Sequence, residues 1–547
     1  MAKVEVVHAS WKGLLVQVYK DGGVRADDVP AVARPDSFFQ YADLNPDRIA
    51  VVEPGGTSHT FGELHRLANR ISHALRAANI VAGDRVALLS PNCADFLAIL
   101  LGAEQVGVKV VPVNYHLTAP EIAYIVTNSD SRLLLVHANY ESVAQLAMAT
   151  ASLPSDRCLL LGPSTSSGRR FSDLIDQYSE DPPLDRVHGS VMMYTSGTTG
   201  RPKGVSWPSR EVDPESAARA LDPLMALRGM QHDVAAVSLV SGPLYHGAPL
   251  GWGTQALHHG HSLVLMDKWD SREFLRLVQR HGVTTAQLAP IHFYRLLQLT
   301  ADERAQFDTS TLQVVSHSGA PTPVTVKRHI MEWLGPVLYE YYASTEGFGT
   351  SISPQDWLEH PGSVGRVDGN GADMQILDED GNGVGAGVTG TLWIRNPGGL
   401  ASEYFGDAEK TVSARRGEYF TTGDMAYIDG SGWLYLVDRR TDMILSGGVN
   451  IYPAEIEDVM RTHPAVDDVA VLGLPDEEWG QRVHAVVVPA AGHRPDDHLA
   501  SEILGELAHS VAKYKVPKTV EFRDLLPYSA SGKLLRRVLR EDLAESE

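Results

Sequence analysis

The chain has 547 residues, of which 43% are hydrophobic and 21% charged, a composition typical of a globular protein with more than one core. Its 47 basic and 68 acidic residues give a formal net charge of −21, which argues against a nucleic-acid-binding surface and against docking on anionic lipid. The two cysteines, Cys93 and Cys158, provide neither a disulfide framework nor a thiolate metal site and fit a reducing cytoplasm. No signal peptide is recognised, and the most apolar stretch reaches Glu104 too soon to span a membrane.

The first half of the chain alternates predicted strands and helices. Residues 1–34 are expected to precede the main fold, as a packing arm, a dimer contact or a disordered tail. Leu64, Leu67, Ile71 and Leu75 recur at helical spacing and predict a helix over 61–78. Similar patterns predict helices at 37–44 and 94–106 and strands at 49–52, 85–89 and 109–113. This alternation resumes from 158 to 291 and is typical of an α/β fold with a largely parallel sheet.

The predicted secondary structure changes near residue 362. Short strands at 374–377, 391–394 and 434–437, separated by Gly and Asp turns, predict a small antiparallel sheet or barrel. The pattern after 438 predicts a compact α+β unit, with helices at 454–461 and 499–512 and strands at 469–472, 483–488 and 519–522. We therefore predict a domain boundary at 438–442.

Residues 194–204 form a glycine- and hydroxyl-rich segment that suits phosphate binding. Its glycines allow several backbone N–H groups to point into one concavity, its hydroxyls add neutral donors, and Lys203 adds a cation. The segment is not a Walker A loop, because no Gly-Lys-Ser/Thr ends it. The predicted phosphate-binding residues are Thr195, Ser196, Gly197, Thr198, Thr199, Gly200 and Lys203.

This segment resembles the signature loop of the adenylate-forming superfamily, and further motifs follow in the family's order. They are Ser318-Gly319-Ala320-Pro321, Tyr342-Ala343-Ser344-Thr345-Glu346, Thr422-Gly423-Asp424, Asp438-Arg439, Ser446-Gly447-Gly448, residues 450–455 and Lys533. The chain thus looks like an acyl-CoA synthetase of the fatty-acid or aryl-acid CoA ligase type. The resemblance implies an α/β fold with a large N-terminal domain of two α/β layered subdomains and a small β-barrel-like subdomain, followed by a small mobile α+β C-terminal domain. The implied boundaries are 1–34 for the extension, 35–438 for the AMP-binding domain and 439–547 for the C-terminal domain.

The resemblance also implies roles for single residues. A carboxylate attacks the α-phosphorus of ATP, pyrophosphate leaves, and the protein contributes mainly positioning and electrostatic stabilisation. Glu346 is the implied magnesium ligand, Thr345 binds the α-phosphate and Lys533 bridges the carboxylate and the α-phosphate. On the nucleotide, Tyr342 stacks on adenine and Asp424 accepts from the ribose hydroxyls. The remaining implied contacts with the nucleotide are Gly319, Ala320, Pro321 and Arg439.

His246 resembles the family residue at the acyl pocket, where it gates the carboxylate or the thiol. A neutral histidine supplies no charge for a substrate ammonium, so we expect an acid without an α-amino group. Phe348 and Trp252 indicate an apolar acid, which is fatty, aryl or polycyclic, although such aromatics also occur in cores. A packed structural role remains the alternative for His246. The predicted pocket residues are His246, Trp252, Ser318, Tyr341, Ala343, Gly347 and Phe348.

The second half-reaction in the family requires the C-terminal domain to swing and to receive the thiol of coenzyme A. The predicted hinge is Arg440 and Thr441, and Thr441 stands where the family usually has Asp or Lys. A hinge needs backbone freedom, so threonine is compatible with the swing. Ser446, Gly447 and Gly448 are expected to let pantetheine pass close to the backbone.

Two other motifs are set aside. Residues 385–390 match G-x-G-x-x-G but precede a predicted strand, so we interpret them as a turn between strands. The run His258-His259-Gly260-His261 is interpreted as a polar turn before a strand, because no further ligands follow at a metal-site spacing.

The sequence therefore predicts a cytoplasmic, ATP-dependent acyl-CoA ligase that uses Mg²⁺ and coenzyme A. Three alternatives stay open at this point: an enzyme that stops at the adenylate or passes the acyl group to a carrier protein, a luciferase-like oxygenase, and a non-catalytic nucleotide-binding protein. The predicted partners are a small carboxylic acid, ATP and coenzyme A, with an acyl carrier protein and a homodimer left open.

Overall fold

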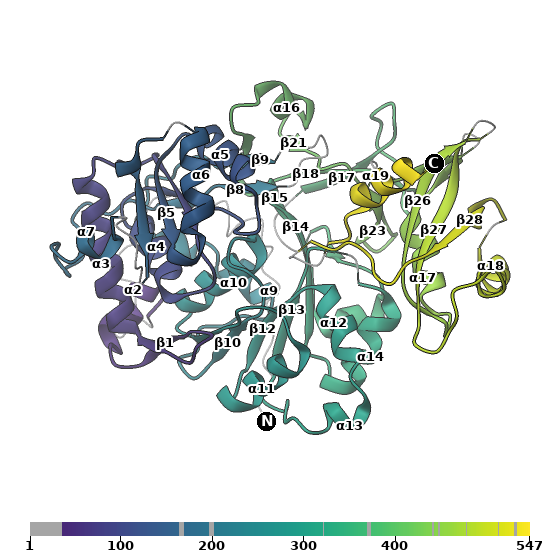
Figure 1. Cartoon of the computed structure of the whole chain (residues 1–547), viewed down its shortest axis with the longest axis horizontal. Helices are drawn as coiled ribbons and strands as arrows, with labels where there is room; N and C mark the ends of the chain where they lie inside the picture. The colour runs from purple at the N-terminus through teal and green to yellow at the C-terminus, as the bar shows by residue number, and fades with distance from the viewer. Residues whose placement is uncertain are drawn as a thin grey trace, which may run out of the picture.

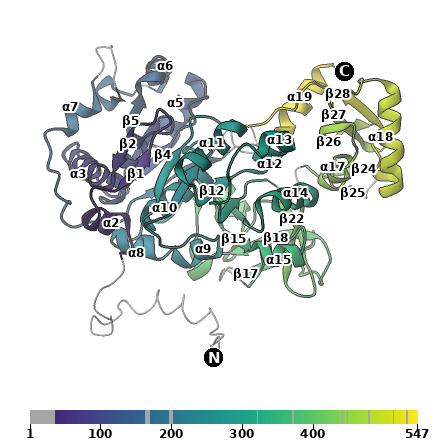
Figure 2. The ribbon, with the colours of Figure 1, turned by 90° about the horizontal axis from the view of Figure 1, so that it is seen from below.

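The computed structural model describes residues 35–546 except 152, 163–168, 196–201, 321, 369–372, 440–441, 447–448, 477–478, 512 and 530–532. The chain folds into two helix-covered sheets, an antiparallel layer and a C-terminal lobe at one end of the molecule (Figures 1 and 2). None of the helices in the described ranges is both long and apolar enough to cross a membrane. The α/β class predicted from the sequence is confirmed.

The first sheet is parallel throughout and has five strands in the order β6-β5-β3-β4-β7. The capping box of Thr60 and Glu63 fixes the start of α3, while α4 is buried on nearly every side because it shares one core with both large sheets. The strands are β3 (Arg85–Leu89), β4 (Lys109–Pro112), β5 (Ser131–His137), β6 (Cys158–Leu161) and β7 (Ser190–Val191). The helices are α3 (Phe61–Ala77), α4 (Ala94–Glu104), α5 (Ala119–Asn128), α6 (Glu141–Ala151) and α7 (Phe171–Ile175).

The second sheet has eight strands in the order β15-β14-β13-β12-β10-β11-β1-β2, of which the six from β14 to β1 run parallel. The parallel strands β13 and β14 end at the same edge and so bring their following residues together there. The strands are β1 (Ile49–Val52), β2 (Ser58–Thr60), β10 (Val237–Val240), β11 (Ser262–Leu265), β12 (Thr285–Leu288), β13 (Val314–His317), β14 (Leu338–Ser344) and β15 (Gly347–Ile352). The helices are α2 (Phe38–Leu44), α8 (Pro214–Arg219), α9 (Asp222–Leu227), α10 (Gly247–His258), α11 (Ser271–His281), α12 (Pro290–Leu297), α13 (Ala301–Arg304), α14 (Val324–Leu334) and α15 (Pro354–Glu359).

An antiparallel layer follows, as predicted, and it packs around its own apolar cluster. A separate small sheet joins β19 to β9 and β8, so the segment before the layer's last strands returns to the phosphate-loop region. The strands of the layer are β16 (Gly365–Arg366), β17 (Asp373–Leu377), β18 (Gly390–Arg395), β20 (Arg415–Arg416), β21 (Tyr419–Phe420), β22 (Asp424–Ile428) and β23 (Trp433–Arg439). The small sheet consists of β8 (Met193–Thr195), β9 (Lys203–Ser206) and β19 (Glu403–Tyr404), and α16 (Ala408–Ser413) follows β19.

The C-terminal lobe is an α+β unit with two apolar clusters. It touches the large body where Nε2 of Gln298 donates to Oδ1 of Asp467 at 3.3 Å and where Arg461 lies over the ring of Tyr294. The segment between β28 and α19 runs from the lobe towards β14 (Figure 1). The elements are β24 (Ile444–Ser446), β25 (Val449–Ile451), α17 (Pro453–Met460), β26 (Val466–Asp476), β27 (Gly480–Pro489), α18 (Asp497–Ser510), β28 (Thr519–Phe522) and α19 (Arg536–Ser546).

Three predicted details have informative outcomes. The β26–β27 hairpin is longer than predicted, because its polar ends pair through their backbones and carry no apolar alternation. Residues 385–389 do lie between strands β17 and β18, and Gly390 opens β18. In the run 258–261, His258 ends α10 and the remaining residues form a turn before β11, but all three histidines are buried. The three-part domain division stays a prediction.

Candidate active site

The hairpin β14–β15 carries the Tyr342–Glu346 motif at its tip. Ser344 pairs with Gly347 across the hairpin, which leaves Thr345 and Glu346 as a two-residue turn. A Cβ atom on Gly347 would lie 2.1 Å from the ring of Phe420, so glycine is required there for the hairpin to approach the antiparallel layer. The turn is thereby held at the meeting point of the second sheet and that layer.

Side chains from other elements fix the backbone of this turn. Trp207, just after β9, donates its indole N–H to the carbonyl of Thr345 at 3.1 Å. Ser402 donates to the carbonyl of Glu346 at 2.8 Å, and Arg415 in turn donates to the carbonyl of Ser402. These bonds come from three separate stretches of chain, so the position of the turn is set by tertiary structure.

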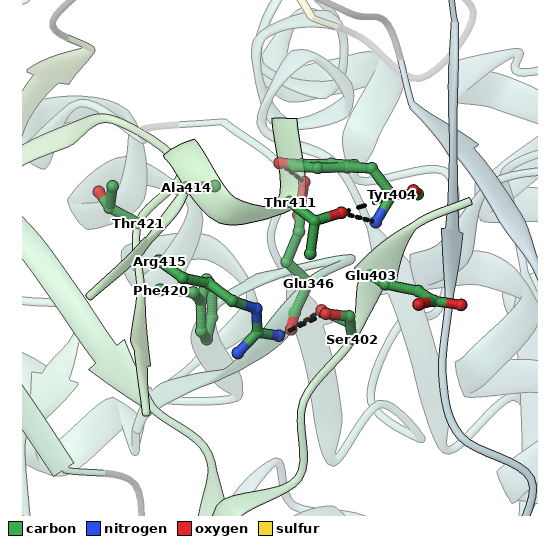
Figure 3. A pocket seen from close by; sticks show the side chains of 9 residues that line it. All are labelled: Glu346, Ser402, Glu403, Tyr404, Thr411, Ala414, Arg415, Phe420 and Thr421. Atoms are coloured by element: carbon green, nitrogen blue, oxygen red, sulfur yellow. Dashed lines mark hydrogen bonds between the residues drawn. The ribbon is translucent and has the colours of Figure 1, made fainter. Parts of the chain in front are cut away.

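The carboxylate of Glu346 is oriented by a single tyrosine. The hydroxyl of Tyr404 donates to Oε1 of Glu346 at 2.8 Å (Figure 3). The ring of Tyr404 also lies 5.5 Å from Nζ of Lys203. Tyr404 therefore contacts both the predicted metal ligand and the predicted phosphate-loop cation. The surrounding hollow is lined by Glu346, Ser402, Glu403, Tyr404, Thr411, Ala414, Arg415, Phe420 and Thr421 (Figure 3).

Two cations, Lys203 and Lys410, lie close to one another near Tyr404. Lys203 opens β9 opposite Thr195, the last residue of β8. Burial and the adjacent ammonium of Lys410, on α16, lower the pKa of Lys203. Two neighbouring ammonium groups favour an anion between them. Ser196, Gly197, Thr198, Thr199 and Gly200 lie outside the described residues.

The residues predicted to bind adenine and ribose, Tyr342 and Asp424, contact one another where β14 meets the antiparallel layer. The hydroxyl of Tyr342 donates to Oδ2 of Asp424 at 2.5 Å, and Thr422 donates to the same oxygen at 2.6 Å. Asp424 opens β22 directly after Gly423, which adopts a φ of 84° that favours glycine. The backbones of Asp424 and Arg439 lie in register on β22 and β23. Gly319 and Ala320 follow β13, while Pro321 lies outside the described residues.

Lys533 reaches this site from the C-terminal lobe. Its Cε atom lies 4.0 Å from the position that a Cβ atom on Gly319 would occupy. Its charge also acts on His246: burial first, and then the cation of Lys533, lower the pKa of His246 to about 4. His246 is thus a neutral imidazole at the amino end of α10, and its Nε2 has no hydrogen-bond partner within the described ranges.

The predicted acyl-pocket residues divide into two groups. Tyr341, Ser318 and Trp252 are buried, and Trp252 is part of the large hydrophobic core, whereas Ala343 is exposed. Phe348 packs against Trp207, with ring centroids 5.9 Å apart, and so supports the turn from behind. Gly347 lies against the ring of Phe420, where a Cβ atom would not fit.

The sequence interpretation missed several residues of this region. Arg228, after α9, places its guanidinium carbon 3.8 Å from the ring centroid of Tyr341, and burial lowers its pKa. Tyr404, Ser402 and Lys410 were missed because they are separated from Glu346 by more than fifty residues and belong to no motif. Among these residues, only Trp207 could have been suspected from the sequence, because it is an aromatic residue three positions after Gly204 of the phosphate-binding segment.

Of the residues predicted to form the hinge and the coenzyme A tunnel, only Ser446 belongs to the described part of the chain. Ser446 ends β24 and pairs with Val449 of β25. Gly447, Gly448, Arg440 and Thr441 lie outside the described residues, so the predictions for the tunnel and the hinge stay untested.

The comparisons with known proteins agree with this geometry. The chain is 33% identical over 505 residues to the fatty acid–[acyl-carrier-protein] ligase ScoC of Streptomyces coeruleorubidus, covering 92% of this chain and 94% of that protein. It is 34% identical over 508 residues to a long-chain-fatty-acid–CoA ligase of Mycobacterium tuberculosis, covering 92% and 97%. The amide bond synthetase McbA of Marinactinospora thermotolerans superposes with a TM-score of 0.79 at 27% identity, covering 92% and 99%.

Two family models match in the order that the motifs predicted. Residues 38–405 match the AMP-binding enzyme family, and residues 455–533 match the C-terminal domain of AMP-binding enzymes. The chain therefore belongs to the AMP-binding enzyme family and is an adenylate-forming enzyme.

Proposed function

We propose that this protein is an ATP-dependent ligase that converts an apolar carboxylic acid to its coenzyme A thioester through an acyl adenylate. The observation that carries the proposal is the position of Lys533, whose Cε lies at Gly319 while its charge reaches His246. Lys533 belongs to the C-terminal lobe, yet it comes close both to Gly319 of the predicted nucleotide site and to His246 of the predicted acyl site. This arrangement supports the adenylation step of the reaction.

In the first half-reaction, a carboxylate oxygen of the acid bonds to the α-phosphorus of ATP, and the bond to the pyrophosphate oxygen breaks. Lys533 and Thr345 would stabilise the charge on the α-phosphoryl oxygens, while Lys203 and its loop would hold the β- and γ-phosphates. Tyr342 would lie against adenine. Asp424 would accept from the ribose, with its carboxylate already oriented by Tyr342 and Thr422.

Magnesium fits the residues at Glu346. A hard cation prefers oxygen ligands, and the carboxylate of Glu346 is held in place through one of its two oxygens by Tyr404. When bound, Mg²⁺ would neutralise charge on the phosphate oxygens. The chain's own contribution is to fix the direction of the carboxylate before ATP arrives.

In the second half-reaction, the thiol of coenzyme A would attack the acyl carbonyl, and AMP would leave. We propose that the lobe pivots at Arg440 and Thr441 and that Ser446, Gly447 and Gly448 line the path of pantetheine. His246, which is neutral at physiological pH, is suited to contact the carboxylate or the thiol without adding charge. We place this reaction in the cytoplasm, in keeping with the two free thiols of Cys93 and Cys158.

A second acceptor is favoured by one specific observation. The similar Streptomyces protein is named as a ligase that acts on an acyl carrier protein. Transfer to a carrier thiol uses the same chemistry as transfer to coenzyme A, and the two differ only in what presents the pantetheine. The acceptor is therefore the part of the proposal that most needs a direct test.

The test is pyrophosphate release from MgATP across a panel of fatty, aryl and polycyclic acids, with coenzyme A, with a pantetheinylated carrier protein, or with neither. Release that requires the acid and rises with coenzyme A, together with thioester formation, is the expected result. Release that rises only with the carrier protein would replace the acceptor but keep the adenylation. A chain that releases no pyrophosphate with any acid would overturn the proposal.

A further inference from the structure

A second cluster of chemically capable side chains lies outside the proposed active site. It consists of Asp222 at the start of α9, His232 in the following loop and His259 directly after α10. His246 and His259 flank opposite ends of α10, a helix of 12 residues, so the cluster is about 18 Å from the acyl end of that helix. The adenylation chemistry gives these three residues no role.

The neighbouring histidines show what a satisfied buried imidazole requires. His258 accepts from the backbone N–H of Phe38 at Nδ1 and donates from Nε2 to Glu104, at 3.2 and 3.3 Å. His261 donates from Nε2 to the carbonyl of Gln231 at 2.7 Å, and its Nδ1 lies 2.9 Å from the hydroxyl of Ser238. Each neutral ring has one nitrogen facing an acceptor and the other facing a donor.

His259 breaks this rule. Its Nδ1 lies 2.8 Å from the carbonyl oxygen of Gln255, which can only accept, so Nδ1 carries the hydrogen. Its Nε2 then presents a lone pair, and this lone pair faces Oδ1 of Asp222 at 3.5 Å. That carboxylate oxygen is buried and has no hydrogen-bond partner among the described residues. Two acceptors therefore face each other at a buried position.

Protonation of His259 would resolve the conflict at a high cost. The residue is only 1% exposed, and the ring of His232 stacks on it with a centroid distance of 4.1 Å. A charged ring at this depth would lose most of its hydration, so the cost follows from the burial alone. A bound cation resolves the same conflict without charging the ring.

We propose that Asp222, His232 and His259 bind a divalent transition-metal ion of the zinc class. Their ligand atoms lie within 4.8 Å of one another, and Nε2 of His232 is 3.2 Å from Oδ2 of Asp222. The other imidazole faces the second oxygen of the same carboxylate, since Nε2 of His259 is 3.5 Å from Oδ1 of Asp222. Both distances are near the value of about 3.3 Å between neighbouring ligands of a tetrahedral zinc site with bonds of 2.0–2.1 Å. Two imidazoles and one carboxylate suit zinc, cobalt or nickel better than magnesium or calcium, which prefer oxygen.

The surroundings complete the site. The carbonyl of Gln255 fixes the tautomer of His259 that leaves Nε2 available, and the hydroxyl of Tyr41 lies 3.3 Å from Nδ1 of His232. Asp222 is 33% and His232 17% exposed, so a water molecule can supply the fourth ligand. Because Tyr41 lies on α2, the ion would tie α9, α10 and α2 together and act as a structural clamp.

The experiment uses the full-length, tag-free protein without ATP, stripped of metal with a chelator and then titrated with Co²⁺ and Zn²⁺. We expect one Co²⁺ per chain with visible d–d absorption, its displacement by Zn²⁺, and a higher Tm with either ion. Asp222→Asn and His259→Gln should each weaken Co²⁺ binding by at least about 100-fold. The matched controls are His281→Gln, which changes a partly exposed histidine on α11, and Cys93→Ser, and both should bind as the wild type does.

A wild-type chain that binds no Co²⁺ or Zn²⁺ would overturn the proposal. Binding that survives in both Asp222→Asn and His259→Gln would also overturn it, because the ion would then lie elsewhere. Asp222 is partly exposed, so Asp222→Asn keeps the test valid even if His259→Gln fails to fold. The absorption of the wild-type protein needs no variant at all.

Discussion

The turn that carries Glu346 and the segment that carries Lys533 belong to one proposed active site but are built in different ways. The turn is held by Trp207 and by Ser402 and Tyr404, which come from two stretches of chain far from the turn in sequence. Lys533 is an exposed residue in a segment that reaches over from the C-terminal lobe. In the proposed site, the carboxylate of Glu346 is held in place before ATP binds, whereas the cation of Lys533 would be brought in by the position of the C-terminal lobe.

Removal of the delivered charge is expected to have the largest effect. Lys533→Ala should lower the rate of acid-dependent pyrophosphate release on the order of 10²- to 10³-fold, because a cation aimed at the transition state is lost. The Tm should change little, since the side chain is exposed. The matched control is Lys518→Ala in the same lobe. Unchanged pyrophosphate release would mean that Lys533 is not catalytic.

Neutralisation of the preorganised charge comes next. Glu346→Gln keeps an oxygen for Tyr404 but removes the negative charge that would hold Mg²⁺, so we expect a loss on the order of 10²-fold at low Mg²⁺ and partial recovery at high Mg²⁺. Activity as a function of Mg²⁺ concentration is the measurement. A loss that high Mg²⁺ does not reduce would argue against Glu346 as the metal ligand.

The contrast between the two regions also explains what the sequence could predict. Motif residues such as Tyr342, Asp424 and Glu346 could be proposed because they stand in motifs that resemble those of the adenylate-forming superfamily, in the same order along the chain. The helix at 61–77 and the parallel strands could be predicted because the periodicity of their apolar residues is strong.

The supporting residues could not be predicted in the same way. Tyr404 is 58 residues from Glu346, and their hydrogen bond exists only because β19 pairs with β9. The cluster of Asp222, His232 and His259 was missed for the same reason, since its ligands come from two helix ends and a loop. Sequence separation hides such contacts, and only the tertiary fold brings them together.

Loss of a supporting hydrogen bond should have a smaller effect than loss of a charge. Tyr404→Phe removes the bond to Oε1 of Glu346 and leaves the ring beside Lys203, so kcat/KM should fall about 10-fold, or about 1.4 kcal/mol. The control is Tyr419→Phe, whose hydroxyl bonds to Asp373 in the antiparallel layer and should not affect catalysis. Equal losses in the two variants would show that the effect is not specific to the site.

The smallest expected effect is a change in the pKa of His246, which reports whether Lys533 lies close to the amino end of α10. Because the cation of Lys533 is the second cause, after burial, of the lowered pKa of His246, Lys533→Ala should raise that pKa from about 4 by less than about one pH unit. The sign follows from the removal of a positive charge, which makes protonation of the imidazole less unfavourable. Below pH 6 the variant should therefore hold more protonated His246 than the wild type.

Histidine-selective NMR titration can measure this shift, with His246→Gln to assign the signal. A pKa that does not move would mean that in solution the lobe keeps Lys533 away from α10, even if Lys533→Ala is inactive. A pKa that rises would place the lysine beside the acyl end of the site before any substrate binds. The titration thus tests where Lys533 lies in the free enzyme separately from whether it takes part in catalysis. A measurement of activity alone cannot distinguish the two.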